Sequence, residues 1–594
     1  MLQIKTNRNI VILYMVACMF YACTKELNQA PVSQADKTAI FGSQDGLQLY
    51  ANSFYNILPG ISDIYKTDPS LSDYGAVSSV PSFIVPGAYT SVQSSGWTWT
   101  DLRNINYFIA GLAASPVSES VKENYMAQAK FFRAYFYYAK VQRFGDVPWY
   151  NTPLSVNDTA LLYKGRDSRV LIMDSIVADL DYAAAHIASN NDNTRSTISK
   201  GVIFGFKSRV CLFEGTFRKY QTSYNLQSSA NDYLKMAADA ADSVMESKTY
   251  SLNTAGDSIA YRNLFISTAP IASEIMLANV SSVSLAVYND ANWYFTSATY
   301  GPRFSFIKTF INTYLNRDGT PFTDKPGYDT ITFINETQKR DWRLQQTIRT
   351  PGYTRVNSNG STSPAPPVFS NTYTGYQPIK WCLDGTTYDN GATNTNSISL
   401  MRYAEILLNY AEAKAELGTI TNQDWTMTIG ALRARAGITG GLTLLPTTVD
   451  KYLQTHYFPD ITDPVILEIR RERGIELALE GLRFADLTRW KRGDLLLNTW
   501  NGMYVPKLNT PMDLNGDGVS DVYFYTGSTP ANQISGVNYI NVSADPQKLD
   551  KGTYGNLNWL DNIQRTWADY MYLYPIPFND LQLNPKLEQN TGWK

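Results

Sequence analysis

The chain has 594 residues, more than one hydrophobic core usually serves, and its 51 Lys and Arg nearly balance its 53 Asp and Glu. This balance, without any block of like charges, argues against nucleic acid as the main partner. Aromatic side chains are abundant, with 41 Tyr and 12 Trp, but only two histidines are present. His186 and His456 lack metal-ligand spacing, so the composition argues against zinc sites and acid–base relays built on imidazole.

The first predicted element is a signal peptide over residues 1–22. Residues 10–22 form a mostly apolar run that is shorter than the roughly 18 to 20 residues needed to cross a bilayer. Ala22 and Cys23, followed by polar residues, resemble a bacterial lipobox, although Phe20 stands where leucine is usual. Cys23 is therefore the predicted mature N-terminus and lipid anchor. The alternative is simple secretion with cleavage elsewhere.

Helical periodicity is clear on both sides of a central region. A helix is predicted over about 118–144, capped by Ser118 and ended by Gly145. Residues 399–418 repeat apolar side chains at the spacing of one helix face and stop at Gly418. Further helices are predicted at about 167–188, 198–216, 230–247, 425–436 and 461–479.

Between about 250 and 397 the sequence is rich in Tyr, Thr, Asn, Gly and Pro, which predicts long ordered loops with short strands. The fold class is therefore mainly α. The helical scaffold is predicted mainly over 30–250 and 398–594, around this loop-rich region. Loops of such size in a compact protein are usually functional.

Two cysteines remain once the signal peptide and the lipidated residue are set aside. Cys211 and Cys382 are far apart in the sequence. An exported chain could join them in a disulfide, but two free buried thiols are an equally good interpretation.

Aromatic residues gather in two segments, 87–108 and 287–304. Flat rings suit the C–H face of a pyranose, so loop Trp and Tyr are natural sugar platforms, and the alternative is packing of loops on the scaffold. Trp99, beside a helix that opens near Asp101, is interpreted as packing. The candidate ligand-binding residues are Tyr89, Trp97, Trp293, Tyr294 and Tyr300.

The segment MDLNGDGVSDVYFY resembles a calcium-binding loop. Its oxygen ligands alternate along the chain, with Gly518 at the position of the sharp bend. Phe524 occupies the place where an EF-hand has a bidentate glutamate. A structural Ca²⁺ is weighed evenly against a polar turn that leads into the strand VYFY. The candidate ligands are Asp513, Asn515, Asp517, Val519 through its carbonyl, and Asp521.

Residues 470–489 carry five arginines interleaved with acidic residues. An anion site is one interpretation of these arginines. Glu472, Glu476, Glu480 and Asp486 are interleaved with these arginines, and the alternating signs favour ion pairing within the helical scaffold.

Three blocks together resemble the SusD/RagB family of outer-membrane nutrient-binding lipoproteins. They are AKFFRAYFYYAKVQRFGDVPWYNTPL (129–154), the region from MRYAEILLNYAEAKAELG to Asp494, and MYLYPIPFNDLQLNPKLEQNTGW (571–593). The resemblance implies one domain over 23–594, a stack of tetratricopeptide-like helix pairs with a loop-rich ligand-binding region.

The resemblance also implies a function. A SusD-like protein would sit on the outer membrane through its lipid, facing the cell exterior, and bind an oligosaccharide without catalysis. It would deliver this ligand to a SusC-like TonB-dependent transporter. The alternatives are a RagB-like peptide receptor, a secreted helical glycoside hydrolase whose paired carboxylates leave no sequence fingerprint, and a helical-repeat adaptor without a small ligand.

Overall fold

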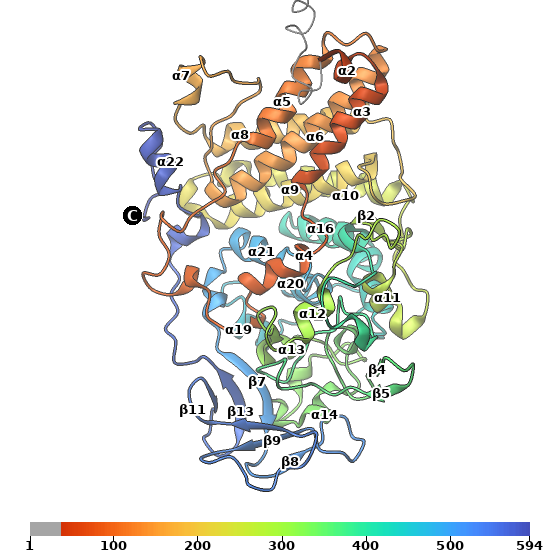
Figure 1. Ribbon diagram of the computed structural model, residues 1–594, viewed down its shortest axis with the longest axis vertical. Coiled ribbons are helices and arrows are strands. Elements are labelled where there is room, and N and C mark those ends of the chain that lie inside the picture. The colour runs from red at the N-terminus through yellow and green to blue at the C-terminus, as the bar shows by residue number, and fades with distance from the viewer. Residues whose placement is uncertain (1–36, 594) are drawn as a thin grey trace, which may run out of the picture.

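The structure is a computed structural model that describes residues 37–593. The predicted signal peptide and Cys23 lie outside the described residues. Within residues 37–593, every helix is too short or too polar to cross a membrane. Helices form one end of the molecule and a β-rich part forms the opposite end, with the loop-rich region between them (Figure 1).

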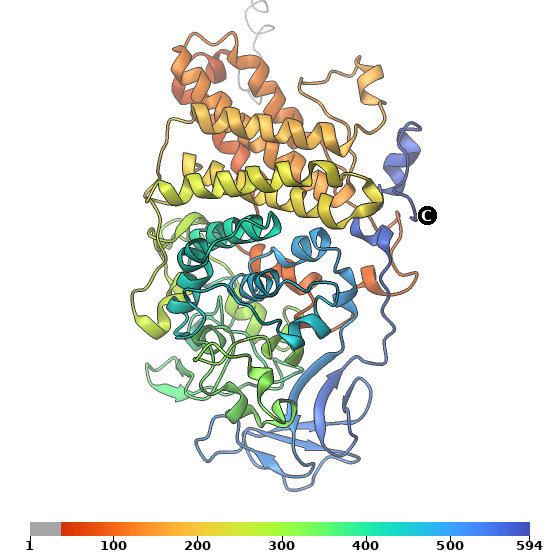
Figure 2. The same ribbon diagram turned by 180° about the vertical axis from the view of Figure 1, so that it is seen from behind.

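The helical end is built from two layers. Helix α6 packs on α5 and α8, and α9 packs on α10 and α8 (Figure 2, where α9 and α10 are yellow). The predicted helices of this part are confirmed within a few residues at their ends. The elements are α2 (Lys37–Phe41), α3 (Gln44–Asn52), α4 (Ile64–Thr67), α5 (Thr100–Leu112), α6 (Glu119–Phe144), α7 (Thr159–Leu162), α8 (Arg169–His186), α9 (Lys200–Tyr220) and α10 (Ala230–Glu246).

Helix α6 explains how this end is held together. It is buried on several sides, including Phe131, Phe132 and Tyr137, because neighbouring helices cover it all round. A helix that is apolar all round belongs inside a protein, which accounts for the dense aromatic sequence of this segment. The helix ends at Gly145, whose φ of 75° suits glycine.

The second helical part packs beneath the first, because α16 contacts both α9 and α10. Helix α16 ends as predicted at Gly418, whose φ is 69°, and Thr419 donates its N–H to the Lys414 carbonyl at 2.9 Å. The elements are α16 (Tyr403–Glu416), α17 (Asn422–Trp425), a π-helical turn (Thr426–Gly430), α18 (Ala431–Arg435), α19 (Lys451–His456), α20 (Pro464–Glu476) and α21 (Arg483–Arg489). Helix α22 (Phe578–Leu583) lies apart from these, at the same edge of the molecule as α7 (Figure 1).

The central region consists of long loops with short elements, as its composition predicts. Strand β2 pairs with β6 and so joins this region to the start of α16. The elements are α11 (Ala260–Ile266), β2 (Ile275–Asn279), α12 (Ala291–Thr296), β3 (Ser305–Phe306), α13 (Lys308–Ile311), α14 (Phe333–Thr337), α15 (Trp342–Thr347), β4 (Thr354–Val356), β5 (Thr362–Pro364) and β6 (Ile398–Arg402).

The extension of the helical scaffold to residue 594 needs correction, because residues 500–559 are mostly strands and loops. One sheet has the order β11-β12-β13-β7, and a second has the order β10-β9-β8. In β7 the buried residues are Trp500, Gly502, Met503 and Val505, and this short extended segment pairs with β13 instead of forming a helix. The strands are β7 (Trp500–Val505), β8 (Pro511–Met512), β9 (Val522–Tyr525), β10 (Asn538–Asn541), β11 (Ser543–Ala544), β12 (Gln547–Leu549) and β13 (Gly555–Trp559).

Cys211 and Cys382 are free and buried, so the disulfide interpretation is wrong. Cys211 lies in the core of the helical end and Cys382 in the core of the central region. Burial raises the pKa of both thiols to about 12. A thiol with such a pKa is unreactive at neutral pH.

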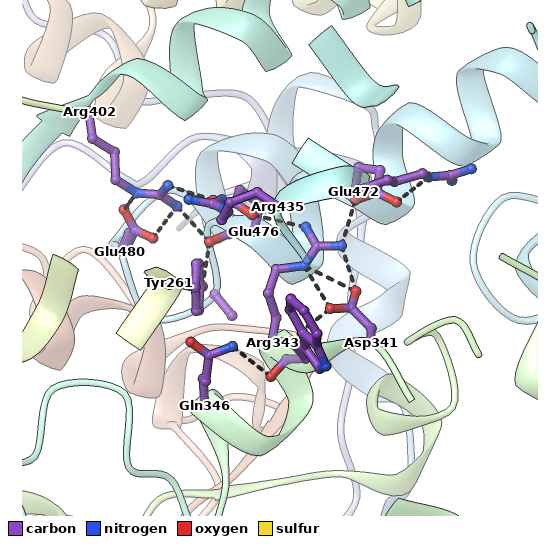
Figure 3. Close-up of polar contacts among 12 residues, drawn as sticks. Tyr261, Asp341, Arg343, Gln346, Arg402, Arg435, Glu472, Glu476 and Glu480 are labelled. Atoms are coloured by element: carbon purple, nitrogen blue, oxygen red, sulfur yellow. Dashed lines mark hydrogen bonds and ion pairs between the residues drawn. The ribbon is translucent and has the colours of Figure 1, made fainter. Parts of the chain in front are cut away.

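The arginine-rich segment forms ion pairs inside the protein, as predicted (Figure 3). Glu476 accepts hydrogen bonds from Arg343 at 2.9 Å and from Arg402 at 2.6 Å, and it also pairs with Arg435. All these side chains are buried. We call this set the central ion network: Glu274, Asp341, Arg343, Arg402, Arg433, Arg435, Glu472, Glu476 and Glu480.

Candidate functional site

The candidate site begins where two distant loops are joined by a short strand pair. Strand β1 (Gly75–Ala76) pairs antiparallel with β3, and the N–H of Ser78 donates to the carbonyl of Pro302 at 2.8 Å. A Cβ on Gly75 would lie 2.0 Å from the Phe304 ring, so the close approach of the strands requires glycine there. The loop after residue 76 therefore lies against the loop before residue 305.

The most regular feature of the second loop is a stacked aromatic pair, Trp293 and Tyr300, which we call the aromatic platform. Their ring centroids are 3.6 Å apart and their planes differ by 12°. Trp293 lies on α12, and the chain turns back at Gly301, where φ is 75°. Both rings are partly exposed. Such a pair offers a flat apolar surface with a polar edge.

Asp290 holds the aromatic platform to the rest of the protein. Its carboxylate accepts hydrogen bonds from Lys66 at 2.7 Å, from Tyr300 at 2.5 Å and from the buried Tyr65. Lys66 also lies 5.3 Å from the centroid of the Tyr294 ring. Helix α4 thus delivers a cation to the platform from a segment more than 200 residues away.

The electrostatics of Asp290 follow from these contacts. Burial alone would raise its pKa, but the hydrogen bonds from Lys66, Tyr300 and Tyr65 outweigh burial and hold the pKa below its ordinary value. The same hydrogen bond to Asp290 raises the pKa of Tyr300. At neutral pH the site therefore holds an ionised carboxylate and a neutral phenol.

A second aromatic pair, Tyr373 and Trp559, lies against the same two loops. Their ring centroids are 3.8 Å apart and their planes differ by 14°. Trp559 donates its indole N–H to the Val77 carbonyl at 2.9 Å, and the Arg303 guanidinium lies 4.2 Å from the Tyr373 ring centroid. The joined loops thus carry stacked rings from three parts of the chain.

Two pockets open beside these loops, and Leu71 lines both of them. One has a volume of about 350 Å³ and lies between the two loops, with Tyr294 and Pro302 in its wall. The other, about 560 Å³, contains Lys66 and Arg143. Pockets of this size are typical of small-ligand sites, and the larger one combines the rings of Phe484 and Tyr574 with charged side chains. The arrangement can stack on a flat ring and exchange hydrogen bonds, and Asp290 is too acidic to serve as a proton donor at neutral pH.

The five ring residues predicted to bind ligand fall in three places. Trp293, Tyr294 and Tyr300 lie together, although Tyr294 is buried and contributes an edge to the pocket wall. Tyr89 packs among Phe83, Tyr574 and Trp593. Trp97 is 8% exposed and packs against Phe144 and Trp99.

Sequence reasoning missed Tyr65, Lys66, Asp290, Tyr373 and Trp559. Asp290 precedes Ala291 and Trp293 in the aromatic segment, and an acidic residue next to clustered rings is the one signal that could have marked it. The other four residues lie far away in the sequence, and only the β1–β3 pairing and the packing of α4 bring them near the aromatic platform.

The predicted calcium loop is a tight turn before β9, and the predicted strand VYFY is confirmed as β9. Asp513 accepts hydrogen bonds from the amides of Gly516 at 2.6 Å and Gly518 at 2.8 Å, and Asp517 accepts from Val519 at 2.8 Å. Asp521 accepts from the amide of Leu514. Across residues 37–593, three or more His, Cys, Asp or Glu side chains nowhere gather as a metal-binding group. Calcium therefore stays a prediction.

Comparison with known proteins gives two family matches. The model of the SusD family matches residues 281–593, more than half of the chain. A second model, described as "Starch-binding associating with outer membrane", matches residues 77–209. The two matches include both loops of the candidate site.

Similar individual proteins carry the same family name. One SusD-like protein of Formosa agariphila is 31% identical over 29% of this chain, and this match spans 32% of that relative. A second SusD-like protein of the same organism is 24% identical over 62% of this chain, and this match spans 65% of that relative. Two solved structures from Bacteroides fragilis, a SusD-like protein and a SusD-like carbohydrate binding protein, are each 21% identical with a TM-score of 0.67. They match over 95% and 93% of this chain and 100% of their own. The chain belongs to the SusD family.

Proposed function

We propose that this protein is a cell-surface lipoprotein that binds an oligosaccharide nutrient at the aromatic platform and delivers it to a SusC-like TonB-dependent transporter. The observation that carries the binding site is the stacking of Trp293 on Tyr300 beside two pockets. Sugar rings stack on such faces through their C–H groups, and Lys66 and Asp290 supply polar groups at the edge.

The comparisons support this proposal. The family description of residues 77–209 names starch binding and the outer membrane, and one similar solved structure is named a carbohydrate binding protein. The electrostatics of the site support binding without catalysis, because Asp290 is hydrogen-bonded by three donors and has a lowered pKa. Glycoside hydrolysis by the common route needs a carboxylic acid with a raised pKa beside a second carboxylate.

The test of the binding site is isothermal titration of the protein, lacking its signal peptide, with a panel of oligosaccharides. The double variant Trp293→Ala with Tyr300→Ala should lose at least about tenfold in affinity for any oligosaccharide that the native protein binds. Tyr554→Ala is the matched control, since this tyrosine is 47% exposed and lines none of the pockets described above. Binding of peptides without binding of any glycan would favour the RagB-like alternative, and turnover of a bound glycan would favour the hydrolase.

The anchor and the partner need separate tests. Cys23→Ser should move the protein from the membrane fraction to the soluble fraction while glycan binding persists. Retention of this variant in the membrane would contradict the lipid anchor. For the partner, detergent-solubilised native protein should copurify with a TonB-dependent barrel, and its purification alone under mild detergent would count against a stable complex.

A further inference from the structure

A third pocket lies on the helical end, where the start of α5 meets the loop 148–163 and α22. Its volume is about 560 Å³, and it shares no lining residue with the two pockets beside the aromatic platform. Its lining includes residues of both α7 and α22, which project from the same edge of the molecule (Figure 1). We call it the scaffold pocket. Its principal residues are Trp97, Trp99, Arg103, Tyr150, Thr152 and Asp580.

Aromatic rings form a corner in the scaffold pocket. Trp99 meets Trp97 edge to face, with centroids 5.4 Å apart at 82°, and meets Tyr150 at 5.7 Å and 85°. The Lys140 ammonium lies 5.6 Å from the Trp99 ring centroid and fixes this ring from the scaffold side. Flat faces at right angles suit a small ring-shaped ligand with C–H faces.

The polar groups of the pocket retain hydrogen-bonding capacity. Across the part of the chain that the structure describes, neither indole N–H, of Trp97 or of Trp99, has an acceptor, although Trp97 is only 8% exposed. The exposed Arg103 guanidinium and the Asp580 carboxylate likewise have no hydrogen-bond partner among those residues, although the charge of Lys140 partly offsets the rise in the pKa of Asp580 that burial causes. Both indole N–H groups can therefore donate to solvent or to a ligand in the pocket.

The charges and the burial of the lining residues indicate which class of ligand fits the pocket. Three donors and one carboxylate acceptor around apolar rings match a neutral molecule that has hydroxyl groups on its rim and C–H groups on its faces. The pocket volume lies within the roughly 300 to 1,000 Å³ of typical small-molecule sites. Val156 and Leu583 line the pocket and are exposed, so the pocket is open to solvent on this side.

We propose that the scaffold pocket is a second saccharide-binding site, for one or two neutral pyranose rings, separate from the aromatic platform. Trp99 and Tyr150 stack on the sugar ring, the two indole N–H groups and Arg103 donate to its oxygens, and Asp580 accepts from its hydroxyls. The proposal does not depend on the function of the platform.

The experiment uses the Trp293→Ala, Tyr300→Ala protein, so that failure of one site does not hide the other. Methyl glycosides of glucose, galactose, mannose and xylose, and the corresponding disaccharides, are titrated by saturation-transfer NMR and tryptophan fluorescence. At least one should bind saturably. Adding Arg103→Ala and Asp580→Asn should weaken that affinity by about tenfold, since each removes a charged hydrogen-bond partner.

A pocket-filling variant provides an independent check. Thr152 is exposed and lines the pocket, so Thr152→Trp should abolish binding without disturbing the core, as verified by circular dichroism. The proposal is overturned if no saccharide of the panel binds the platform-deficient protein, or if binding survives both Thr152→Trp and the loss of Arg103 and Asp580.

Discussion

The central ion network and the aromatic platform are both organised by a carboxylate, but the two carboxylates have different surroundings. Glu476 is fully buried and is held by three arginines that are buried with it. Asp290 is bound by Lys66, which is 29% exposed and lines one of the pockets, by the partly exposed Tyr300 and by the buried Tyr65. Buried partners hold a fold together, whereas a carboxylate whose partners reach the surface can lie beside a ligand. Burial of the partners therefore separates scaffold from site more clearly than residue type does.

The largest loss of stability is expected for Glu476→Gln, a substitution within the central ion network. Removing this charge leaves three buried arginines without a shared acceptor, so the free energy of unfolding should fall by about 3 to 5 kcal/mol. Urea denaturation measures this loss. Asp239→Asn is the control, because Asp239 pairs with Lys235 in solvent, and its loss should be below about 1 kcal/mol. Equal losses in the two variants would contradict a scaffold role for the network.

Acid should weaken the scaffold through Glu412. Burial alone would raise its pKa, but Arg489 outweighs burial and lowers the pKa from 4.5 to about 2 in the folded protein. Since the unfolded state takes up its proton first, this stabilisation is complete above pH 4.5 and is lost as the pH falls toward 2. It amounts to about 3 kcal/mol.

Urea denaturation at pH 7 and pH 3.5 measures this effect in the native protein and in Glu412→Gln. The variant should be less stable at pH 7 and should lose less stability between the two pH values. An unchanged pH dependence would show that Glu412 contributes nothing to acid sensitivity.

Asp290→Asn tests the carboxylate beside the aromatic platform. Three hydrogen bonds lose their ionised acceptor at a partly exposed position, so the free energy of unfolding should fall by only about 1 to 2 kcal/mol. Glycan affinity should fall several-fold, because Tyr300 and Lys66 are no longer held beside the platform. Tyr65→Phe is the control that keeps both of these contacts, and its affinity should stay close to native. If Tyr65→Phe lost as much glycan affinity as Asp290→Asn, the loss would reflect a general loosening of the site and not the contacts of Lys66 and Tyr300.

The carboxylates of the predicted calcium loop have a third kind of surroundings, because they are exposed and their hydrogen-bond partners are backbone amides. If Ca²⁺ binds there, a tenfold excess over its Kd should stabilise the protein by about 1.4 kcal/mol. Differential scanning fluorimetry with CaCl₂ and MgCl₂ measures this, with Asp517→Ala as the variant that should not respond. No calcium-specific shift in the native protein would make the segment a plain polar turn.

Much of the fold follows from local sequence patterns. The helices α6, α8, α9, α10, α16 and α20 could be placed from apolar periodicity and caps, and Gly418 acts as the predicted stop. Alternating charges in 470–489 indicated ion pairing, but distant segments supply many of the partners, as Arg343 and Arg402 do for Glu476. The residues 500–559 were misplaced because short strands beside polar turns carry a weaker periodic signal than helices.

The sequence by itself determined that rings are concentrated in residues 287–304 and that the protein is mainly helical. Only the tertiary structure decided which rings share a surface. The β1–β3 pairing, the packing of α4 and the docking of Trp559 join residues hundreds of positions apart. Such contacts depend on packing between distant segments, and the sequence of one segment alone does not indicate which other segment it will contact. Burial likewise removed Tyr294 from the exposed platform and placed Trp97, only 8% exposed, in the wall of the scaffold pocket.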